Sequence, residues 1–200
     1  MTEIINPKHY DELAKLDPAD VCKRAVCIYD DLNNCYTLNV LGSDYVIYPK
    51  KQTIECADHS DPPKDFLSLF AIHYLLTCVE TSPSGKWISE KDMVGGVTFF
   101  RGPHEIPTAL ISDNVNNSLE QFNALGQKFN GQKLDMGDAA FSFKVTERIP
   151  MALLYWQGDE DFPAEAKILY DSSLPKHFAL DIVYALAVGL CEKFGKSFVA

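Results

Sequence analysis

Residues 61–80, with the sequence DPPKDFLSLFAIHYLLTCVE, constrain the fold more than any other segment of the chain. Pro62 and Pro63 predict the start of a helix, and apolar side chains then follow at steps of three and four residues. These side chains surround nearly the whole helix, which therefore needs apolar partners on almost every side. We predict a buried central helix around which the other elements pack.

The N-terminal part of the chain carries signals for two short helices and a β-hairpin. Asn6-Pro7 and Asp17-Pro18 each place a capping side chain before a proline, which predicts two helices within the first ~27 residues. Two alternating runs flank Gly42-Ser43 and predict the hairpin. The segment KQTIEC is a candidate third strand, and Pro49 interrupts the chain before it.

Further strands and helices follow without regular alternation. Strands are predicted between Gly96 and Gly102 and at residues 138–145, 150–156 and 165–171, and helices at 116–129 and 176–194. The mixture predicts an α+β fold with an antiparallel or mixed sheet. Because 200 residues suit one domain, we expect a single domain over residues 1–200, with hairpins packed against the central helix and a long C-terminal helix.

The charge balance limits the kinds of partner. The chain has 18 basic and 28 acidic residues and a net charge of −10, which argues against nucleic acid and anionic membranes and suits cations or a basic protein partner. No apolar run reaches the ~18 residues of a membrane span, and no secretory signal is visible. We therefore expect no membrane contact and a cytoplasmic location.

The six cysteines do not form a recognisable cluster motif. None belongs to a Cys-x-x-Cys pair, and Cys22, Cys27 and Cys35 have spacings that match no common zinc or iron–sulfur pattern. We therefore expect reduced, buried thiols and no metal site. A metal or cluster site that uses these three cysteines is the alternative.

The segment VGGVTFFRGPH combines a glycine pair with an arginine. Gly95 and Gly96 allow a tight turn or the close approach of a ligand to the backbone, although no Walker or dinucleotide-binding motif is present. Arg101 follows an apolar and aromatic run, which predicts a partly buried guanidinium that needs a carboxylate or an anionic ligand. His104, in the following Gly-Pro loop, is expected to be exposed.

The segment YWQGDEDFP places three consecutive carboxylates after a predicted strand. One interpretation is a solvated turn that Trp156 and Phe162 pin to the protein. The other is a carboxylate site at a strand end, where functional loops are common. Asp159 or Glu160 is also the predicted partner of the Arg101 guanidinium.

His73 lies inside the apolar helix. A single histidine in such a setting is typical of a hydrogen-bonded core residue. As a cofactor ligand, His73 would need an open pocket and an acceptor for its second ring nitrogen. Both roles remain open at this stage, and the first is favoured.

Several segments together resemble an uncharacterised domain family of anaerobic bacteria and archaea. They are FAIHYLL, GGVTFFRGPH, LDMGDAAFSF and RIPMALLYWQGDEDFPAEAKILYDSSLPKHF, and the similarity runs from about Leu13 to the last apolar helix. The most specific part matches the family at Trp156, Gly158, Asp159, Glu160, Phe162 and Pro163. Some relatives resemble fusions with ferredoxin-like iron–sulfur modules, but this chain lacks a cluster-binding cysteine run. The resemblance implies an anaerobic setting and a link to corrinoid, tetrapyrrole or iron–sulfur metabolism.

These observations favour an accessory domain that binds a ligand or cofactor between sheet and helices. The candidate ligand-binding residues are Gly95, Gly96, Arg101, His104, Trp156, Asp159 and Glu160. One alternative is an enzyme that uses a carboxylate or histidine of this site for acid–base chemistry, which requires these groups to converge. Another is an acidic module that binds a basic protein. The sequence identifies neither the cofactor nor a catalytic residue.

Overall fold

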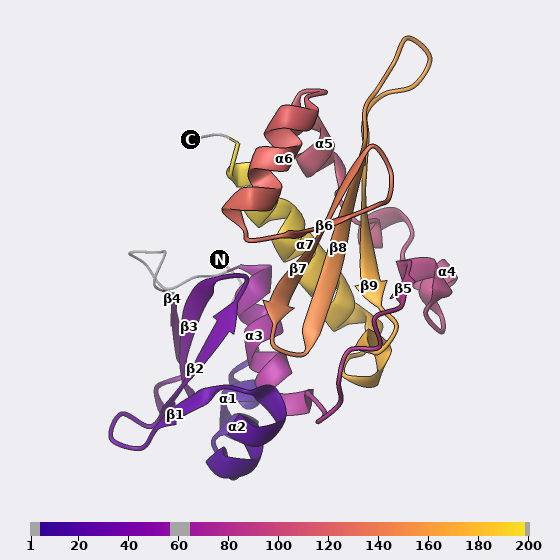
Figure 1. Cartoon of the computed structure of the whole chain (residues 1–200). Helices are drawn as coiled ribbons and strands as arrows, with labels where there is room; N and C mark the ends of the chain where they lie inside the picture. The colour runs from indigo at the N-terminus through magenta and orange to yellow at the C-terminus, as the bar shows by residue number, and fades with distance from the viewer. Residues whose placement is uncertain (1–4, 57–64, 199–200) are drawn as a thin grey trace.

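Two antiparallel sheets form the framework of the structure, a computed structural model that describes residues 5–56 and 65–198 (Figure 1). The first sheet has the order β1-β2-β3-β4, with β1 (Ile28–Asp30), β2 (Cys35–Val40), β3 (Ser43–Tyr48) and β4 (Thr53–Cys56). The second has the order β5-β9-β8-β7-β6, with β5 (Trp87–Ile88), β6 (Gln132–Leu134), β7 (Ala139–Thr146), β8 (Ile149–Trp156) and β9 (Glu165–Asp171). The predicted α+β fold is confirmed.

The helices follow the capping signals of the sequence. They are α1 (Pro7–Leu13), α2 (Pro18–Ala25), α3 (Phe66–Thr77), α4 (Gly96–Phe99), α5 (Ala109–Val115), α6 (Leu119–Lys128) and α7 (Leu180–Lys196). The side chains of Asn6 and Asp17 accept hydrogen bonds from the first turns of α1 and α2, as predicted. The long C-terminal helix is confirmed as α7, whereas α5 was not predicted.

The central helix α3 is buried, as its apolar surface requires. Asp65 caps its first turn by accepting hydrogen bonds from the Ser68 backbone and hydroxyl, and the predicted start at Pro62-Pro63 lies outside the described residues. α3 packs along α7. A Cβ atom at Gly189 of α7 would lie 2.8 Å from the Leu67 side chain, so the glycine allows the two helices to approach closely.

The two sheets meet at the tip of the β2–β3 hairpin (Figure 1). Leu41 and Gly42 form the predicted turn, with φ angles of 51° and 83°, and Ser43 already belongs to β3. Positive φ at both turn residues matches the right-handed twist of a two-residue hairpin. The Leu41 N–H group donates a 2.7 Å hydrogen bond to the Val145 carbonyl of β7. This bond ties the first sheet to the second.

One continuous apolar core joins both sheets to the central helices. It includes Tyr36 and Ile47 of the first sheet and Phe141 and Tyr155 of the second. A second, smaller cluster lies on the opposite face of the second sheet, where alternate side chains of β7, β8 and β9 point away from the helices. The second sheet therefore has apolar side chains on both faces.

The predicted strand between Gly96 and Gly102 is wrong. Gly96–Phe99 forms the short helix α4, and a 3-10 turn follows at Gly102–His104. Gly95 begins α4 with a φ of 79°, and a Cβ atom at Gly96 would overlap the Glu90 carbonyl oxygen. The glycine pair thus closes a turn against another segment of backbone, and this tertiary contact overrides the strand propensity of the aromatic residues.

The buried carboxylate of Asp171 anchors the chain that leads into β5. It accepts hydrogen bonds of 2.6–2.9 Å from the backbone and hydroxyl groups of Ser84 and Ser173 and from the Gly85 N–H group. Burial alone raises the pKa of Asp171, but the bonds from Ser173 and Ser84 outweigh burial and bring the pKa to about 2. The charged form is therefore the one that stabilises the fold.

We predict that Asp171→Asn lowers the free energy of unfolding at pH 7 by about 2 kcal/mol, because the folded pKa lies below the unfolded value. In the wild type this contribution is complete above pH ~4 and is lost as the pH falls towards ~2. Urea unfolding at several pH values measures both effects. The exposed Asp161→Asn is the control, and equal stability of Asp171→Asn and wild type at pH 7 would contradict the prediction.

Candidate functional site

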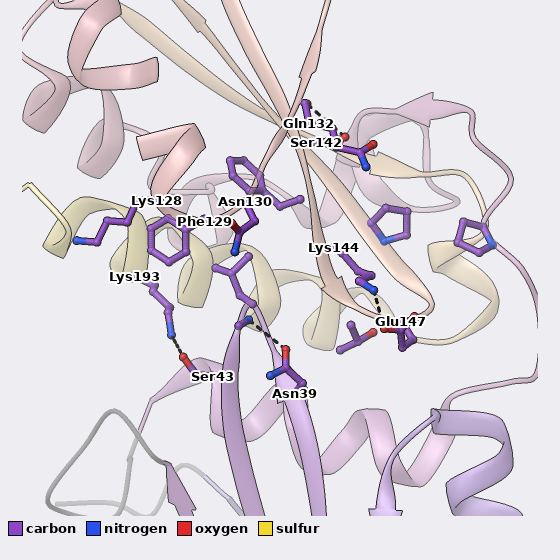
Figure 2. A pocket seen from close by; sticks show the side chains of 16 residues that line it. Asn39, Ser43, Lys128, Phe129, Asn130, Gln132, Ser142, Lys144, Glu147 and Lys193 are labelled. Carbon is purple, nitrogen blue, oxygen red and sulfur yellow. Dashed lines mark hydrogen bonds and ion pairs between the residues drawn. The ribbon is translucent and has the colours of Figure 1, made fainter. Parts of the chain in front are cut away.

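A cavity of about 730 Å³ lies beside the contact between the two sheets (Figure 2). Its wall is formed by the tip of the β2–β3 hairpin, the connection from α6 to β6, the strand β7 with its following turn, and α7. These elements come from positions 39 to 193 of the chain. The cavity is therefore a product of the tertiary fold and has no counterpart in a local sequence motif.

Lysine side chains give this cavity a positive lining. Among the described residues that line it, Lys128, Lys144 and Lys193 are accompanied by one carboxylate, that of Glu147. The Lys144 ammonium contacts Glu147 at 2.6 Å, and the Lys193 ammonium donates a 2.6 Å hydrogen bond to the Ser43 hydroxyl (Figure 2). Three positive groups beside one negative group form a cationic region in a chain of net charge −10.

Amide and aromatic side chains complete the wall. Asn130 follows the end of α6 with a φ of 53°, and the next residue, Gly131, donates a 2.7 Å hydrogen bond back to the Gly126 carbonyl. This closed turn fixes Asn130 at the rim. Phe129 and Phe143 each pack on Phe194 of α7 with ring centroids 5.0 Å apart, so an apolar surface lies beside the polar one.

Arg148 fixes the β7–β8 turn, which forms part of the wall. Its guanidinium donates hydrogen bonds to the carbonyl groups of Arg24 at 2.6 Å, Thr81 at 3.2 Å and Lys23 at 3.3 Å. The first and third acceptors lie at the C-terminal end of α2, where a helix leaves carbonyl groups without partners and favours positive charge. These hydrogen bonds attach the β7–β8 turn to the C-terminal end of α2.

The structure does not form the predicted ion pair between Arg101 and the acidic turn. Arg101 is exposed, and its Nε–H group donates to the Val97 carbonyl of its own helical turn. Asp159 accepts hydrogen bonds from the N–H groups of Asp161 and Phe162, which lower its pKa. Each group is satisfied locally, and none of the ion pairs of the described residues joins them.

The predicted site residues lie in two separate places. The loop after β8, which contains Asp159 and Glu160, extends beyond the end of the second sheet, whereas α4 lies beside β5 (Figure 1). Glu160 is exposed. The turn is solvated, but Phe162 does not pin it, since this side chain is 72% exposed. Trp156 instead packs against the outer apolar cluster of the second sheet.

The residues around α4 do come together. The exposed His104 ring stacks on Phe99 at 4.6 Å and meets Tyr184 edge-on at 5.3 Å. A shallow hollow of about 350 Å³ next to this group is lined by Arg101 and Glu105. None of the candidate ligand-binding residues lines the larger cavity. His104 follows α4, whereas Asp159 and Glu160 lie in the loop after β8.

The cysteines separate into two groups. Cys35 and three others are buried, as predicted, whereas Cys22 and Cys27 are partly exposed. In the part of the chain that the structure describes, no three His, Cys, Asp or Glu side chains converge as metal ligands. The structure therefore gives no support to a metal site built from the first three cysteines.

Comparison with protein families places the chain in a group defined by sequence. The model of a domain of unknown function (DUF3786) matches residues 17–193. The chain belongs to this family. No curated protein and no solved structure matches the chain. Within residues 5–56 and 65–198, no helix has the length and apolar character needed to cross a membrane.

His73 packs against another histidine in the interface between α1 and α3. The rings of His73 and His9 lie 4.4 Å apart in a T-shaped arrangement. Burial, followed by the proximity of His9, lowers the pKa of His73 to about 4. His73 is therefore neutral at pH 7 and acts as a packing residue of this interface.

We predict that protonation of His73 destabilises the protein in mild acid. The unfolded chain takes up the proton near pH 6.5 and the folded chain only near pH 4, so the free energy of unfolding falls as the pH drops through this window. The slope is at most about 1.4 kcal/mol per pH unit. Urea unfolding between these pH values should show a smaller slope for His73→Gln. Parallel pH profiles of the two proteins would contradict the prediction.

Proposed function

We propose that the protein is an accessory domain that binds a small organic anion in the cavity between its sheets. The observation that carries the proposal is the cluster of Lys128, Lys144 and Lys193 around one concave surface. Lysine ammonium groups are common ligands of phosphate and carboxylate groups. A positive surface of this kind also attracts anions from solution to an otherwise acidic molecule.

The size and lining of the cavity support a ligand of metabolite or cofactor size. Small-molecule sites usually have volumes of roughly 300–1,000 Å³, with apolar walls and a few polar groups that set the orientation. Here Phe129 and Phe143 supply the apolar wall, and Asn39, Asn130 and Gln132 supply amide groups. A ligand with an apolar or planar body and at least one acidic group fits this combination.

The contacts that build the wall also support a site that exists before the ligand arrives. Leu41 is tied to Val145, and Arg148 fixes the β7–β8 turn. A preformed site loses little conformational entropy on binding. This favours binding of a ligand over docking of a flexible protein segment.

The biological setting of this proposal comes from the sequence resemblance. Relatives in anaerobic bacteria and archaea, some fused to iron–sulfur modules, make a cytoplasmic cofactor of anaerobic metabolism the favoured class of ligand. Flavin nucleotides carry phosphate on a chain attached to their ring system, and tetrapyrroles carry carboxylate side chains, so both have the required chemistry. Nucleic acid is not favoured, because the whole chain carries a net charge of −10.

Titration calorimetry with flavin mononucleotide, haem, a corrinoid carboxylic acid, citrate and inorganic phosphate tests the proposal. We expect at least one of these probes to bind, with an affinity that falls as salt rises. Lys128→Met and Lys144→Met should each weaken binding roughly three- to tenfold, since each removes one charge from the cavity. Failure of every probe to bind would contradict the proposal for these ligand classes.

Two further variants separate a local effect from a general effect of charge. Lys15→Met removes an exposed lysine that does not line the cavity, and it should leave binding unchanged. Glu147→Gln removes the carboxylate that pairs with Lys144, and it should strengthen binding. Equal weakening by Lys15→Met and Lys144→Met would place the anion outside the cavity.

A further inference from the structure

The C-terminal end of α2 is a left-handed helix cap built from Cys22, Val26 and Cys27. Val26 has a φ of 52°, and its N–H group donates to the Cys22 carbonyl. The Cys27 N–H group donates to the same carbonyl at 3.4 Å. In this type of cap, the residue after the left-handed position and the residue five places earlier bring their side chains into contact. The backbone therefore holds positions 22 and 27 together.

Both of the side chains in contact are cysteines, where such a cap usually has two apolar residues. Their Sγ atoms lie 3.8 Å apart, and a disulfide requires about 2.05 Å. The hydrogen bond from the Cys27 N–H group to the Cys22 carbonyl already joins the two positions through the backbone. Cys22 and Cys27 are therefore the pair that the geometry favours for a disulfide bond.

Cys22 and Cys27 also differ from the other four cysteines in their exposure to solvent. Cys22 and Cys27 are partly exposed. The other cysteines are buried, namely Cys35, Cys56, Cys78 and Cys191. Burial and the neighbouring Cys22 raise the pKa of the Cys27 thiol. The raised pKa lowers the thiolate fraction of Cys27 at neutral pH, so its reaction is expected to be slow there and to accelerate as the pH rises.

We propose that Cys22 and Cys27 form a redox-active dithiol that becomes a reversible intramolecular disulfide by exchange with a small-molecule disulfide. One cysteine thiolate attacks a sulfur atom of the small disulfide, forms a mixed disulfide and releases one thiolate. The second cysteine then attacks the protein sulfur of that mixed disulfide and releases the other thiolate. The two cysteines are oxidised, the small disulfide is reduced to two thiols, and the two protons of the cysteines pass to these thiols. Neither Cys22 nor Cys27 lines the anion cavity.

The test uses the full chain, reduced and then equilibrated with mixtures of reduced and oxidised glutathione. Free thiols are trapped with N-ethylmaleimide in denaturant and counted by mass spectrometry. At high ratios of oxidised glutathione, we expect four of the six cysteines to be trapped. Trypsin cleaves after Lys23 and Arg24, and the protease Asp-N cleaves before Asp30 and Asp31, so the two enzymes together place Cys22, Cys27 and Cys35 on three separate peptides. A disulfide between Cys22 and Cys27 then joins two peptides that separate on reduction.

Variants assign the bond to its two sulfur atoms. Cys22→Ser and Cys27→Ser should each abolish the joined peptides and retain one glutathione on the remaining cysteine of the pair. Cys35→Ser and Cys191→Ser replace buried cysteines and should retain the joined peptides. Circular dichroism checks the fold of each variant, and the peptide map of the wild type gives the main answer without any variant.

Three outcomes would overturn the proposal. The first is trapping of all six cysteines at every glutathione ratio. The second is a joined peptide that contains a cysteine other than Cys22 and Cys27. The third is a wild-type protein that accumulates a glutathione adduct at either position without closing the intramolecular bond.

Discussion

The apolar surface of α3 on every side is the constraint on which the rest of the structure depends. Such a helix is stable only when neighbours cover it all round. The chain meets this requirement with α7, which approaches closely at Gly189, with α1 and α2, and with β2 and β3 of the first sheet. The two sheets then meet where Leu41 bonds to Val145. The cavity beside this contact is thus a consequence of how the central helix is covered.

Much of the fold could be predicted because its signals are local. Asn6 and Asp17 cap their helices through neighbouring residues, and the alternating runs of β2 and β3 mark the first hairpin by themselves. The strand predicted after Gly96 is wrong for another reason. This segment is helical because Gly96 packs against the Glu90 carbonyl, and the sequence of the segment does not reveal that tertiary contact. The two-residue strand β5 also depends on tertiary contacts. It pairs with β9, and the Asp171 carboxylate binds the chain that leads into it.

The candidate site shows the same division between local and tertiary information. Arg101 follows an apolar run and Asp159 belongs to three consecutive carboxylates, which predicts an ion pair between distant segments, but each group finds its hydrogen-bond partner within a few residues. The lysines of the cavity are unremarkable in sequence. Lys128, Lys144 and Lys193 lie on three different elements, and only the packing of α6, β7 and α7 brings them to the wall of one cavity. Spatial grouping of like charges was the missing signal.

The contacts of Arg148 have a consequence for the way in which the chain matures during synthesis. This residue supplies hydrogen bonds to carbonyl groups that precede it by 124, 125 and 67 residues. The end of α2 therefore emerges from the ribosome long before its partner exists. Until the β7–β8 hairpin has been translated, the N-terminal helices lack these bonds and depend on solvent for the same carbonyl groups. The hydrogen bonds at this helix end can therefore be completed only after residue 148 has been synthesised.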